Sequence, residues 1–356
     1  MQENLKELKV LGIMSGTSLD GLDLALCSFS RNNSHWNYYI IKAETLPYPK
    51  DIRDFLESAI SLKANELCML DHYYGKWIGN SAKEFLRKNN LSADLISSHG
   101  HTVFHQPAKS YTLQIGNGND IHATTGIQVV NDFRSMDVAL GGNGAPLVPV
   151  GDEYLFAEYD ICLNLGGFSN LSYKDTSSKR IAFDICPVNM ALNYLALKTG
   201  VEFDCAGKMG RQGKIIPAIL DKLNSIEFYS SHPPKSLGRE WFIENIQAIL
   251  DEKQELDDIM RSLYEHIAIQ ISKNIENIGA KTVLVSGGGA KNKFLMELLS
   301  EKTKSKLVSP SNELIDFKEA LIFAFLGYLR VNSIINVFAS VTGSRNDHCA
   351  GSIVNG

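Results

Sequence analysis

The chain has 356 residues, more than one ordinary hydrophobic core accommodates, so two packed domains are the first expectation. Hydrophobic residues make up 44% of the chain and charged residues 21%, which is ordinary globular usage and excludes long disorder. The net charge of −5 provides no attraction for nucleic acid or an anionic membrane, so neither is predicted as a partner.

Three features indicate the cellular compartment. The N-terminal residues Met1–Lys9 are polar and charged, unlike a signal or transit peptide. No apolar run approaches the roughly 18–20 residues that span a bilayer. Six cysteines are scattered without a CxxC pair, which favours reduced thiols over disulfides or a zinc site. The sequence therefore predicts a cytoplasmic protein.

The first part of the chain alternates predicted strands with helices. Asn65 is the expected N-cap of a long helix, with Glu66 in its first turn. A loop of small residues, 139–146, closes this part. Strands are predicted at 9–14, 22–29, 36–41, 94–98, 111–115 and 127–130, and helices at 51–62 and 65–89.

The same pattern restarts near Asp160, with a strand, a glycine turn and a strand. Such a duplicated plan predicts an α/β protein of two domains, residues 1–135 with 340–356 and residues 136–339. Strands are predicted at 161–165, 170–173, 181–184 and 282–286, and helices at 189–198, 256–278, from about 292, and 316–331.

Three glycine-containing turns, Ser15–Gly21, Asn164–Asn170 and Ser286–Asn292, each follow an apolar strand. Glycine lets backbone N–H groups approach a phosphate closely, and Ser, Thr and Asn add neutral donors. None is a Walker loop or a GxGxxG turn of a dinucleotide-binding unit. Any one of them could be a tight turn and nothing more. Three at strand ends favour a nucleotide held between two domains.

Acidic and histidine residues leave alternatives open. Asp20 and Asp23 could organise Mg²⁺ and its waters, or could cap their own turn. The three histidines of His99–His105 could bind zinc, but one intervening glycine and no helical spacing favour a hydrogen-bonding loop.

Two charged residues end predicted strands. Arg134 would point toward the ligand crevice, where its planar fork suits a carboxylate or phosphate; the alternative is an ion pair with Asp132 or Asp137. Asp184 could take a proton from a hydroxyl or water; the alternative is a cap for the helix that starts near Asn189.

Read together, these segments resemble the anhydro-N-acetylmuramic acid kinase family, a branch of the actin, hexokinase and heat-shock-chaperone ATPase superfamily. The similarity covers nearly the whole chain, and its most specific part is the opening signature Gly12–Asp23. The further segments are Ser98–His105, Leu113–Gly116, Val130–Arg134, Gly141–Pro149, Asn164–Asn170, Pro234–Glu240, Ser286–Asn292, Lys318–Ala320 and Val341–Gly343.

The resemblance implies a two-domain actin-like ATPase fold of the ribonuclease H-like type with a deep interdomain cleft. It also implies a reaction in which water opens a 1,6-anhydro-amino sugar while ATP phosphorylates O6. Asp184 matches the catalytic base of the family, and Arg134, Glu319 and Thr102 would face the sugar. ATP and Mg²⁺ are the implied cofactors, with Asp20 reaching the metal through water, and a homodimer is the implied assembly. The residues expected to bind ATP phosphates are Gly16, Thr17, Ser18, Leu19, Asp20, Gly21, Leu22, Asp23, Asn164, Gly166, Gly167, Asn170, Gly287, Gly288, Gly289 and Asn292.

The base segment departs from the family pattern, because Cys186 and Val188 replace two glycines, while Asp184, Pro187 and Asn189 are kept. The substitutions could alter the backbone around the base and shift sugar preference. Two alternatives remain: an ordinary hexosamine kinase that opens no ring, and a nucleotide-binding sensor without catalysis.

Overall fold

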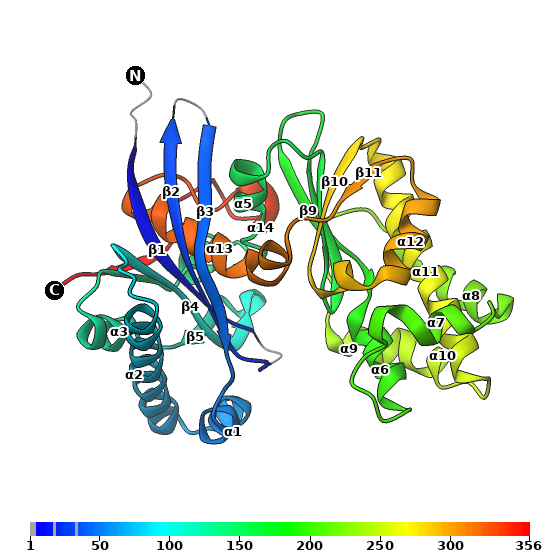
Figure 1. The fold of residues 1–356 in the computed structure, drawn as a ribbon, viewed down its shortest axis with the longest axis horizontal. Helices are drawn as coiled ribbons and strands as arrows, with labels where there is room; N and C mark the ends of the chain where they lie inside the picture. Colours follow the sequence, from blue (N-terminus) through cyan, green and yellow to red (C-terminus); the bar gives the residue numbers. More distant parts are fainter. Residues whose placement is uncertain (1–4, 17–18, 33–34) are drawn as a thin grey trace. The chain divides into compact units, whose positions relative to one another are not determined.

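The structure is a computed structural model that describes residues 5–16, 19–32 and 35–356. It divides into two compact units, unit 1 (Met1–Phe156 with Phe317–Gly356) and unit 2 (Ala157–Asp316). Each unit has its own sheet and its own helices (Figure 1). The predicted two-domain α/β organisation is confirmed.

The chain passes from one unit to the other at two places, and both differ from the predicted domain boundaries. Residues 136–156 and 317–339, which we assigned to the second domain, belong to unit 1. The physical reason is that both segments contact the first strands of unit 1: Tyr328 OH donates to Lys6 O at 2.8 Å, and the centres of the Tyr38 and Phe156 rings lie 5.5 Å apart. The second crossing falls at Phe317, whose backbone interrupts the helical geometry with φ −114° and ψ 15°.

Among the described residues of unit 1, seven strands form one sheet in the order β12-β6-β4-β1-β2-β3, with β5 paired to β4. The strands are β1 Leu5–Ser15, β2 Leu22–Asn32, β3 His35–Leu46, β4 Leu95–Gln106, β5 Tyr111–Ile115, β6 Val129–Asn131 and β12 Ser352–Val354. The helices are α1 Lys50–Ser58, α2 Ala64–Lys88, α3 Gly118–Thr125, α4 Ser135–Ala139, α5 Pro149–Leu155, α13 Asn312–Val331 and α14 Ala339–Thr342. Short 3₁₀ turns lie at η1 Ala59–Ser61 and η2 Pro107–Lys109.

Helices cover both faces of this sheet, because successive residues of a strand point to opposite sides. Ile13 of β1 packs in the cluster that contains Tyr74 and Ile78 of α2. The neighbouring Gly12 faces α13, and a Cβ there would lie 2.0 Å from the Ala320 carbonyl oxygen. β1, β4 and β6 are parallel, so their carboxyl ends share one edge of the sheet.

Among the described residues of unit 2, five strands follow the order β11-β10-β7-β8-β9. The strands are β7 Ile161–Leu165, β8 Phe168–Lys174, β9 Arg180–Pro187, β10 Thr282–Ser286 and β11 Lys306–Val308. The helices are α6 Asn189–Leu197, α7 Lys208–Gln212, α8 Pro217–Asn224, α9 Arg239–Phe242, α10 Ala248–Leu250, α11 Leu256–Ile278 and α12 Lys293–Lys302. The 3₁₀ turns η3 Cys205–Gly207, η4 Glu227–Ser230 and η6 Gly288–Lys291 and the π-turn η5 Ile243–Gln247 complete the unit.

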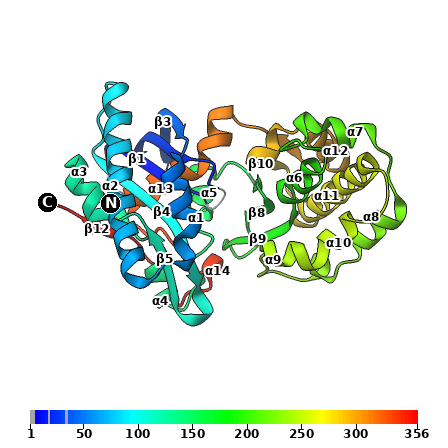
Figure 2. The same cartoon turned by 90° about the horizontal axis from the view of Figure 1, so that it is seen from below.

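The core of unit 2 lies between one sheet face and the helices. Leu163 of β7 and Val283 of β10 belong to the same buried cluster as residues of α6, α11 and α12. Figure 2 shows these three helices together on one side of the sheet. β7, β10 and β11 run parallel, so the turns after β7 and β10 leave the same edge.

Several local predictions match and two are wrong. The strands 111–115, 161–165 and 282–286 and the helix 256–278 have the predicted bounds. The segment expected as a histidine-rich loop is instead the continuation of β4 to Gln106, with a left-handed Gly100 (φ 73°) inside it. The long helix begins after Lys63 rather than Asn65, and the Glu66 carboxylate accepts a 3.0 Å hydrogen bond from the Lys63 N–H.

Two further features concern the cysteines and the length of the apolar helices. All six cysteines are free thiols. Within the described parts of the chain, the search for helices that are both long enough and apolar enough to cross a membrane finds none.

Candidate functional site

The turn between β1 and β2 carries the first predicted phosphate site. Leu19 N–H donates to Gly16 O at 3.3 Å, and Leu19 has a left-handed backbone (φ 57°). Gly21 cannot carry a side chain, because a Cβ would lie 2.7 Å from the Leu46 carbonyl oxygen. Thr17 and Ser18, which we predicted to bind phosphate, lie outside the described residues.

A buried hydrogen-bond chain supports the start of this turn. Ser15, the last residue of β1, accepts from Tyr48 OH at 2.7 Å and contacts His101 Nδ1 at 2.9 Å. Tyr48 OH lies 3.0 Å from Tyr74 OH of α2. Burial lowers the pKa of His101 to about 4, so the ring is neutral and its Nδ1 can accept the Ser15 proton. The chain fixes Ser15 against β4 and α2.

The carboxylates of the turn differ in their surroundings. Asp23 Oδ1 accepts from Thr45 Oγ1 at 2.5 Å, whereas Asp20 is exposed. No group of three metal-ligating side chains occurs among residues 5–16, 19–32 and 35–356. Mg²⁺ commonly binds through one or two carboxylates, its own waters and substrate phosphates, so an exposed Asp20 fits that mode.

Each histidine of the predicted zinc segment has its own partner. His99 is buried, its Nδ1 lies 2.9 Å from Gly100 O, and its Nε2 accepts from Arg134 Nε at 3.0 Å. His101 pairs with Ser15, and His105 Nδ1 lies 3.1 Å from Thr112 Oγ1. Desolvation lowers the pKa of His99 well below its usual value, and the Arg134 charge lowers it further. The three rings act in hydrogen bonding.

Arg134 joins two segments that sequence analysis kept separate. Its Nη1 donates to Gly144 O at 2.6 Å, while Asp137 Oδ2 accepts from Gly144 N at 2.6 Å. Thr342 Oγ1 donates to Asp137 Oδ1 at 2.7 Å. Both oxygens of the Asp137 carboxylate thus accept hydrogen bonds, one from Gly144 N and one from Thr342 Oγ1. Among the described residues, Arg134 forms no ion pair with Asp132 or Asp137. Desolvation lowers the pKa of Arg134 to about 10, and the charges of Glu319 and Asp137 oppose this.

Glu319 and Thr102 lie in the same unit. Glu319 on α13 is exposed, in contrast to its buried neighbour Lys318. Desolvation raises the pKa of Glu319 despite that exposure, the Arg134 charge lowers it, and the Asp23 charge raises it. Thr102 on β4 accepts from Gln114 Nε2 of β5 at 3.3 Å. Unit 1 thus brings Arg134, Glu319 and Asp23 within electrostatic range of one another.

In unit 2, a row of polar residues crosses the sheet. Ser286 of β10 pairs with Asn164 of β7, Asn164 with Asn170 of β8, and Asn170 with Asp184 of β9. The register shifts between Ser169 and Asn170, so Ile185 forms a bulge in β9 next to Asp184. The row joins the second glycine turn, the third glycine turn and the predicted base.

The two glycine turns of unit 2 pack together. Gly287 has φ 81°, and a Cβ there would lie 2.4 Å from Asn164 Oδ1. A Cβ on Gly289 would lie 2.7 Å from the Leu165 Cβ, and Asn189 Nδ2 donates to Leu165 O at 3.0 Å. The turns 164–167 and 286–289 and the start of α6 therefore converge. The carbonyl oxygens of Gly166 and Gly167 also accept hydrogen bonds from the N–H groups of residues 188–190, at the start of α6.

Asn292 has a structural role within unit 2. Its Oδ1 accepts from Leu295 N at 3.2 Å as the N-cap of α12, and its Nδ2 donates to Tyr264 OH at 2.7 Å. These bonds hold the end of the third glycine turn in place. A phosphate contact by the Asn292 side chain remains a prediction.

Asp184 is half-buried on β9, and the helix-cap interpretation is wrong. The N-cap of α6 is Val188, without a capping side chain. The Asp184 carboxylate instead accepts from the Leu237 N–H at 2.7 Å. Burial raises the pKa of Asp184 above its usual value, and the Leu237 hydrogen bond partly opposes the shift. A carboxylate with a raised pKa is suited to taking up a proton.

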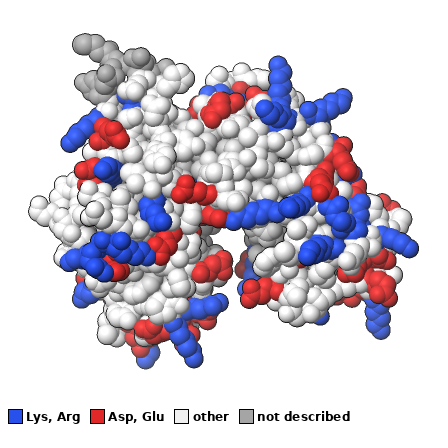
Figure 3. All heavy atoms as spheres, in the orientation of Figure 1, with Lys and Arg blue, Asp and Glu red and all other residues white. Residues whose placement is uncertain are grey.

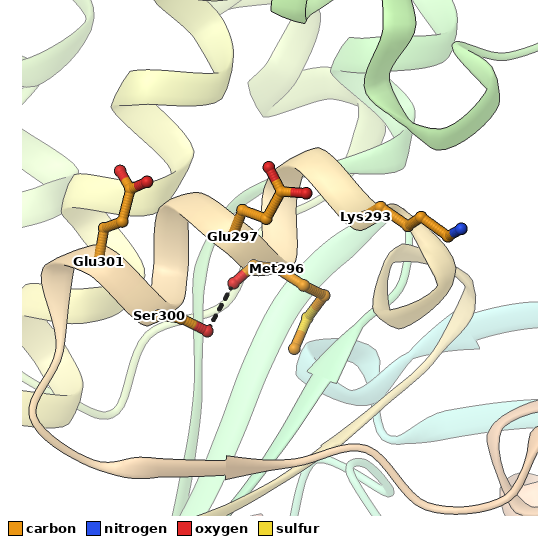
Figure 4. A pocket seen from close by; sticks show the side chains of 5 residues that line it. All are labelled: Lys293, Met296, Glu297, Ser300 and Glu301. Atoms are coloured by element: carbon orange, nitrogen blue, oxygen red, sulfur yellow. Dashed lines mark hydrogen bonds between the residues drawn. The ribbon is translucent and has the colours of Figure 1, made fainter.

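The charged side chains on one face of the molecule can be seen in Figure 3. On the face drawn in Figure 3, acidic and basic side chains are interspersed. Figure 4 shows an open groove lined by Lys293, Met296, Glu297, Ser300 and Glu301, all on one helix, where Ser300 Oγ donates to Met296 O at 2.8 Å. None of these residues is a predicted site residue.

Sequence reasoning missed three contacts: the Leu237 N–H on Asp184, the pairing of His99 with Arg134, and the Ser15–His101 contact. Leu237 lies within Pro234–Glu240, one of the segments of the family resemblance, and that membership was the available signal.

Comparison with known proteins gives a consistent result. A kinase named anhydro-N-acetylmuramic acid kinase from Actinobacillus pleuropneumoniae serotype 7 is 35% identical over 94% of this chain and 95% of its own. The protein of that name from Haemophilus influenzae is 34% identical over 98% of both chains. Among solved structures, component A of (R)-2-hydroxyglutaryl-CoA dehydratase from Acidaminococcus fermentans covers 91% of this chain and 99% of its own at 12% identity, with a TM-score of 0.46, too low to support an argument. The sequence profile described as anhydro-N-acetylmuramic acid kinase matches residues 8–356. The chain therefore belongs to the anhydro-N-acetylmuramic acid kinase family.

Proposed function

We propose that this protein is an ATP-dependent kinase that opens 1,6-anhydro-N-acetylmuramic acid with water and phosphorylates O6, yielding N-acetylmuramic acid 6-phosphate. Family membership and the names of its relatives support the substrate and the reaction class. The observation that carries the chemistry is Asp184, a half-buried carboxylate with a raised pKa, in register with the polar row of unit 2.

The roles follow from what the reaction requires. Water attacks the anomeric carbon and loses a proton, which Asp184 accepts, as a carboxylate does in an inverting glycosidase. The C1–O6 bond breaks, and O6 takes the γ-phosphoryl group of ATP, so it needs no protein acid. The N–H groups of the three glycine turns would neutralise phosphate charge. Asp20 would hold Mg²⁺ through water, and the metal would supply further positive charge.

The sugar is assigned to the charged residues of unit 1. Within the unit, Arg134 Nε donates to His99 and Nη1 donates one hydrogen bond to Gly144 O. The remaining N–H donors of Arg134 suit the lactyl carboxylate of the sugar. Glu319 is exposed and can accept hydrogen bonds from sugar hydroxyls. Thr102 is assigned a weaker contact.

Two further expectations belong to the proposal. The six free thiols support a reducing compartment, the cytoplasm. A homodimer is expected because the resemblance implies it, and sedimentation of the purified protein tests it.

Substitution of the base tests the proposal. Asp184→Asn keeps an oxygen for the Leu237 N–H but cannot accept the proton, so ATP binding is retained and turnover falls by at least about 100-fold. Asp221→Asn, the same change on the exposed face of α8, is the matched control and keeps full activity. Measurement is by ATP-dependent formation of the sugar phosphate and by titration of a nucleotide analogue.

Other outcomes identify the alternatives. Near-normal turnover in Asp184→Asn excludes Asp184 as the base. Wild-type activity on N-acetylglucosamine but none on the anhydro-sugar indicates an ordinary hexosamine kinase. ATP binding without turnover on either sugar indicates a sensor.

A further inference from the structure

The segment Pro234–Gly238 belongs to the family resemblance, yet the proposed function gives it no task. It has no regular secondary structure and leads into α9, whose N-cap is Gly238. It lies against β9 at Asp184.

We infer that this segment is a clamp on Asp184, in which the backbone N–H of Leu237 holds one carboxylate oxygen and leaves the other to receive the proton of water. The inference rests on the proposed function of Asp184. Leu237 is accordingly a positioning residue that acts through its main chain.

Two hydrogen bonds of opposite direction make the clamp. The Asp184 N–H donates to Lys235 O at 3.1 Å, and the Leu237 N–H donates to Asp184 Oδ2 at 2.7 Å. The first fixes the backbone of Asp184 and the second fixes its side chain. Among the described residues, no donor forms a hydrogen bond to Oδ1 of Asp184. A carboxylate held at one oxygen has a defined orientation for its other oxygen.

Lys235 anchors the clamp. Its ammonium donates to Phe228 O at 3.1 Å and lies 4.7 Å from the centre of the Phe228 ring and 5.8 Å from that of Phe183. These contacts tie Lys235, two residues before Leu237, to η4 and to β9.

Apart from burial, the Leu237 N–H is the main influence on the pKa of Asp184. Cys186, on the same strand, is a buried thiol against Ser169, and burial raises its pKa to about 12, so it is uncharged at neutral pH. Tyr229 of η4 is buried, and its pKa is likewise raised. Burial lowers the pKa of Lys235, and the charge of Lys273 on α11 lowers it further.

Removing one N–H tests the inference. Leu237→Pro deletes the donor, whereas Leu237→Ala removes the side chain and keeps the donor. Because the hydrogen bond favours the charged carboxylate, its loss moves the acid limb of the kcat/KM profile to higher pH by about one unit and lowers kcat about 10-fold. In Leu237→Ala the acid limb of the kcat/KM profile stays at its wild-type pH. The thermal transition of Leu237→Pro shows whether this variant is folded. If it is folded and the acid limb of its kcat/KM profile is unchanged, the inference is overturned.

A second measurement uses the unaltered chain. In protein labelled with ¹⁵N-leucine, the Leu237 amide signal, identified by its loss in Leu237→Ala, should titrate with the midpoint of the acid limb and stop titrating in Asp184→Asn. An amide shift independent of pH overturns the inference even if Leu237→Pro does not fold. If Asp184→Asn retains turnover, the proposed function fails; if it is inactive and the amide does not titrate, the clamp alone fails.

Discussion

Arg134 is held so that part of its guanidinium stays available. The Nδ1–H of neutral His99 donates to Gly100 O, which leaves Nε2 to accept from Arg134. Gly144 O accepts a hydrogen bond from Arg134 Nη1. The planar fork is thus oriented before a ligand arrives, which lowers the entropic cost of binding a carboxylate.

The first residue-scale prediction concerns this fork. Arg134→Lys keeps the charge but loses the fork and the Nε bond to His99, so KM for 1,6-anhydro-N-acetylmuramic acid rises about 10-fold or more. KM for 1,6-anhydro-N-acetylglucosamine, which lacks the lactyl carboxylate, changes little. Arg53→Lys, at an exposed pair with Glu57, is the control. Equal losses on both sugars would show that Arg134 does not bind the carboxylate.

A second residue-scale prediction concerns pH. The raised pKa of Asp184 places the acid limb of kcat/KM above the pH at which an ordinary aspartate titrates, and activity is lost as pH falls through that value because the base becomes protonated. The profile between pH 4 and 8 measures this limb. A limb at or below the usual aspartate pKa, about 3.9, contradicts the assignment.

At the scale of elements, α13 places two neighbouring residues in opposite roles. Lys318 is buried against Asp152 of α5, and the next residue, Glu319, is exposed. Successive helical residues point about 100° apart, so one helix can anchor itself with Lys318 and present Glu319 to a ligand.

This contrast is testable with neighbouring substitutions. Lys318→Met removes the buried cation that lies 2.8 Å from Asp152 Oδ1 and lowers the free energy of unfolding by about 3–5 kcal/mol. Glu319→Gln, at an exposed position, changes it by less than about 0.5 kcal/mol but raises KM for the sugar. Urea denaturation and steady-state kinetics measure the two effects. A stability loss in Glu319→Gln equal to that in Lys318→Met would refute the division of roles.

At the scale of the whole molecule, unit 2 is one continuous segment with its own core. Its hydrophobic cluster lies entirely within residues 161–315. Residues 157–316, expressed alone, should therefore fold and show a cooperative thermal transition, measured by circular dichroism. A non-cooperative melt would show that unit 2 depends on the rest of the chain.

The sequence predicted those elements whose signal is local. The strand Ile161–Leu165 is an apolar run that ends in glycine, and the helix Leu256–Ile278 has a long apolar stripe, so both have the predicted bounds. The continuation of β4 through His99–Gln106 was missed because its polar residues and left-handed Gly100 hide the alternation.

Contacts between distant segments were beyond prediction. The glycine turns were recognised because each follows an apolar strand. Asp184 was expected at the end of a strand, whereas it lies inside β9 (Arg180–Pro187). Leu237 follows Asp184 by 53 residues and acts through a backbone N–H common to almost every residue. The boundaries of the units were missed because contacts with the first strand, such as the hydrogen bond from Tyr328 OH to Lys6 O across 322 residues, decide where α13 belongs.

The central claim is that one turnover uses water at the anomeric carbon and ATP at O6. The purified protein, with ATP, Mg²⁺ and 1,6-anhydro-N-acetylmuramic acid in ¹⁸O-water, should give a product phosphorylated at O6 that carries one ¹⁸O at C1. Mass spectrometry quenched early, before the free anomeric hydroxyl exchanges with solvent, with ¹⁶O-product in ¹⁸O-water as the exchange control, measures the label. Phosphorylated product with no ¹⁸O at C1 beyond that control would contradict the account.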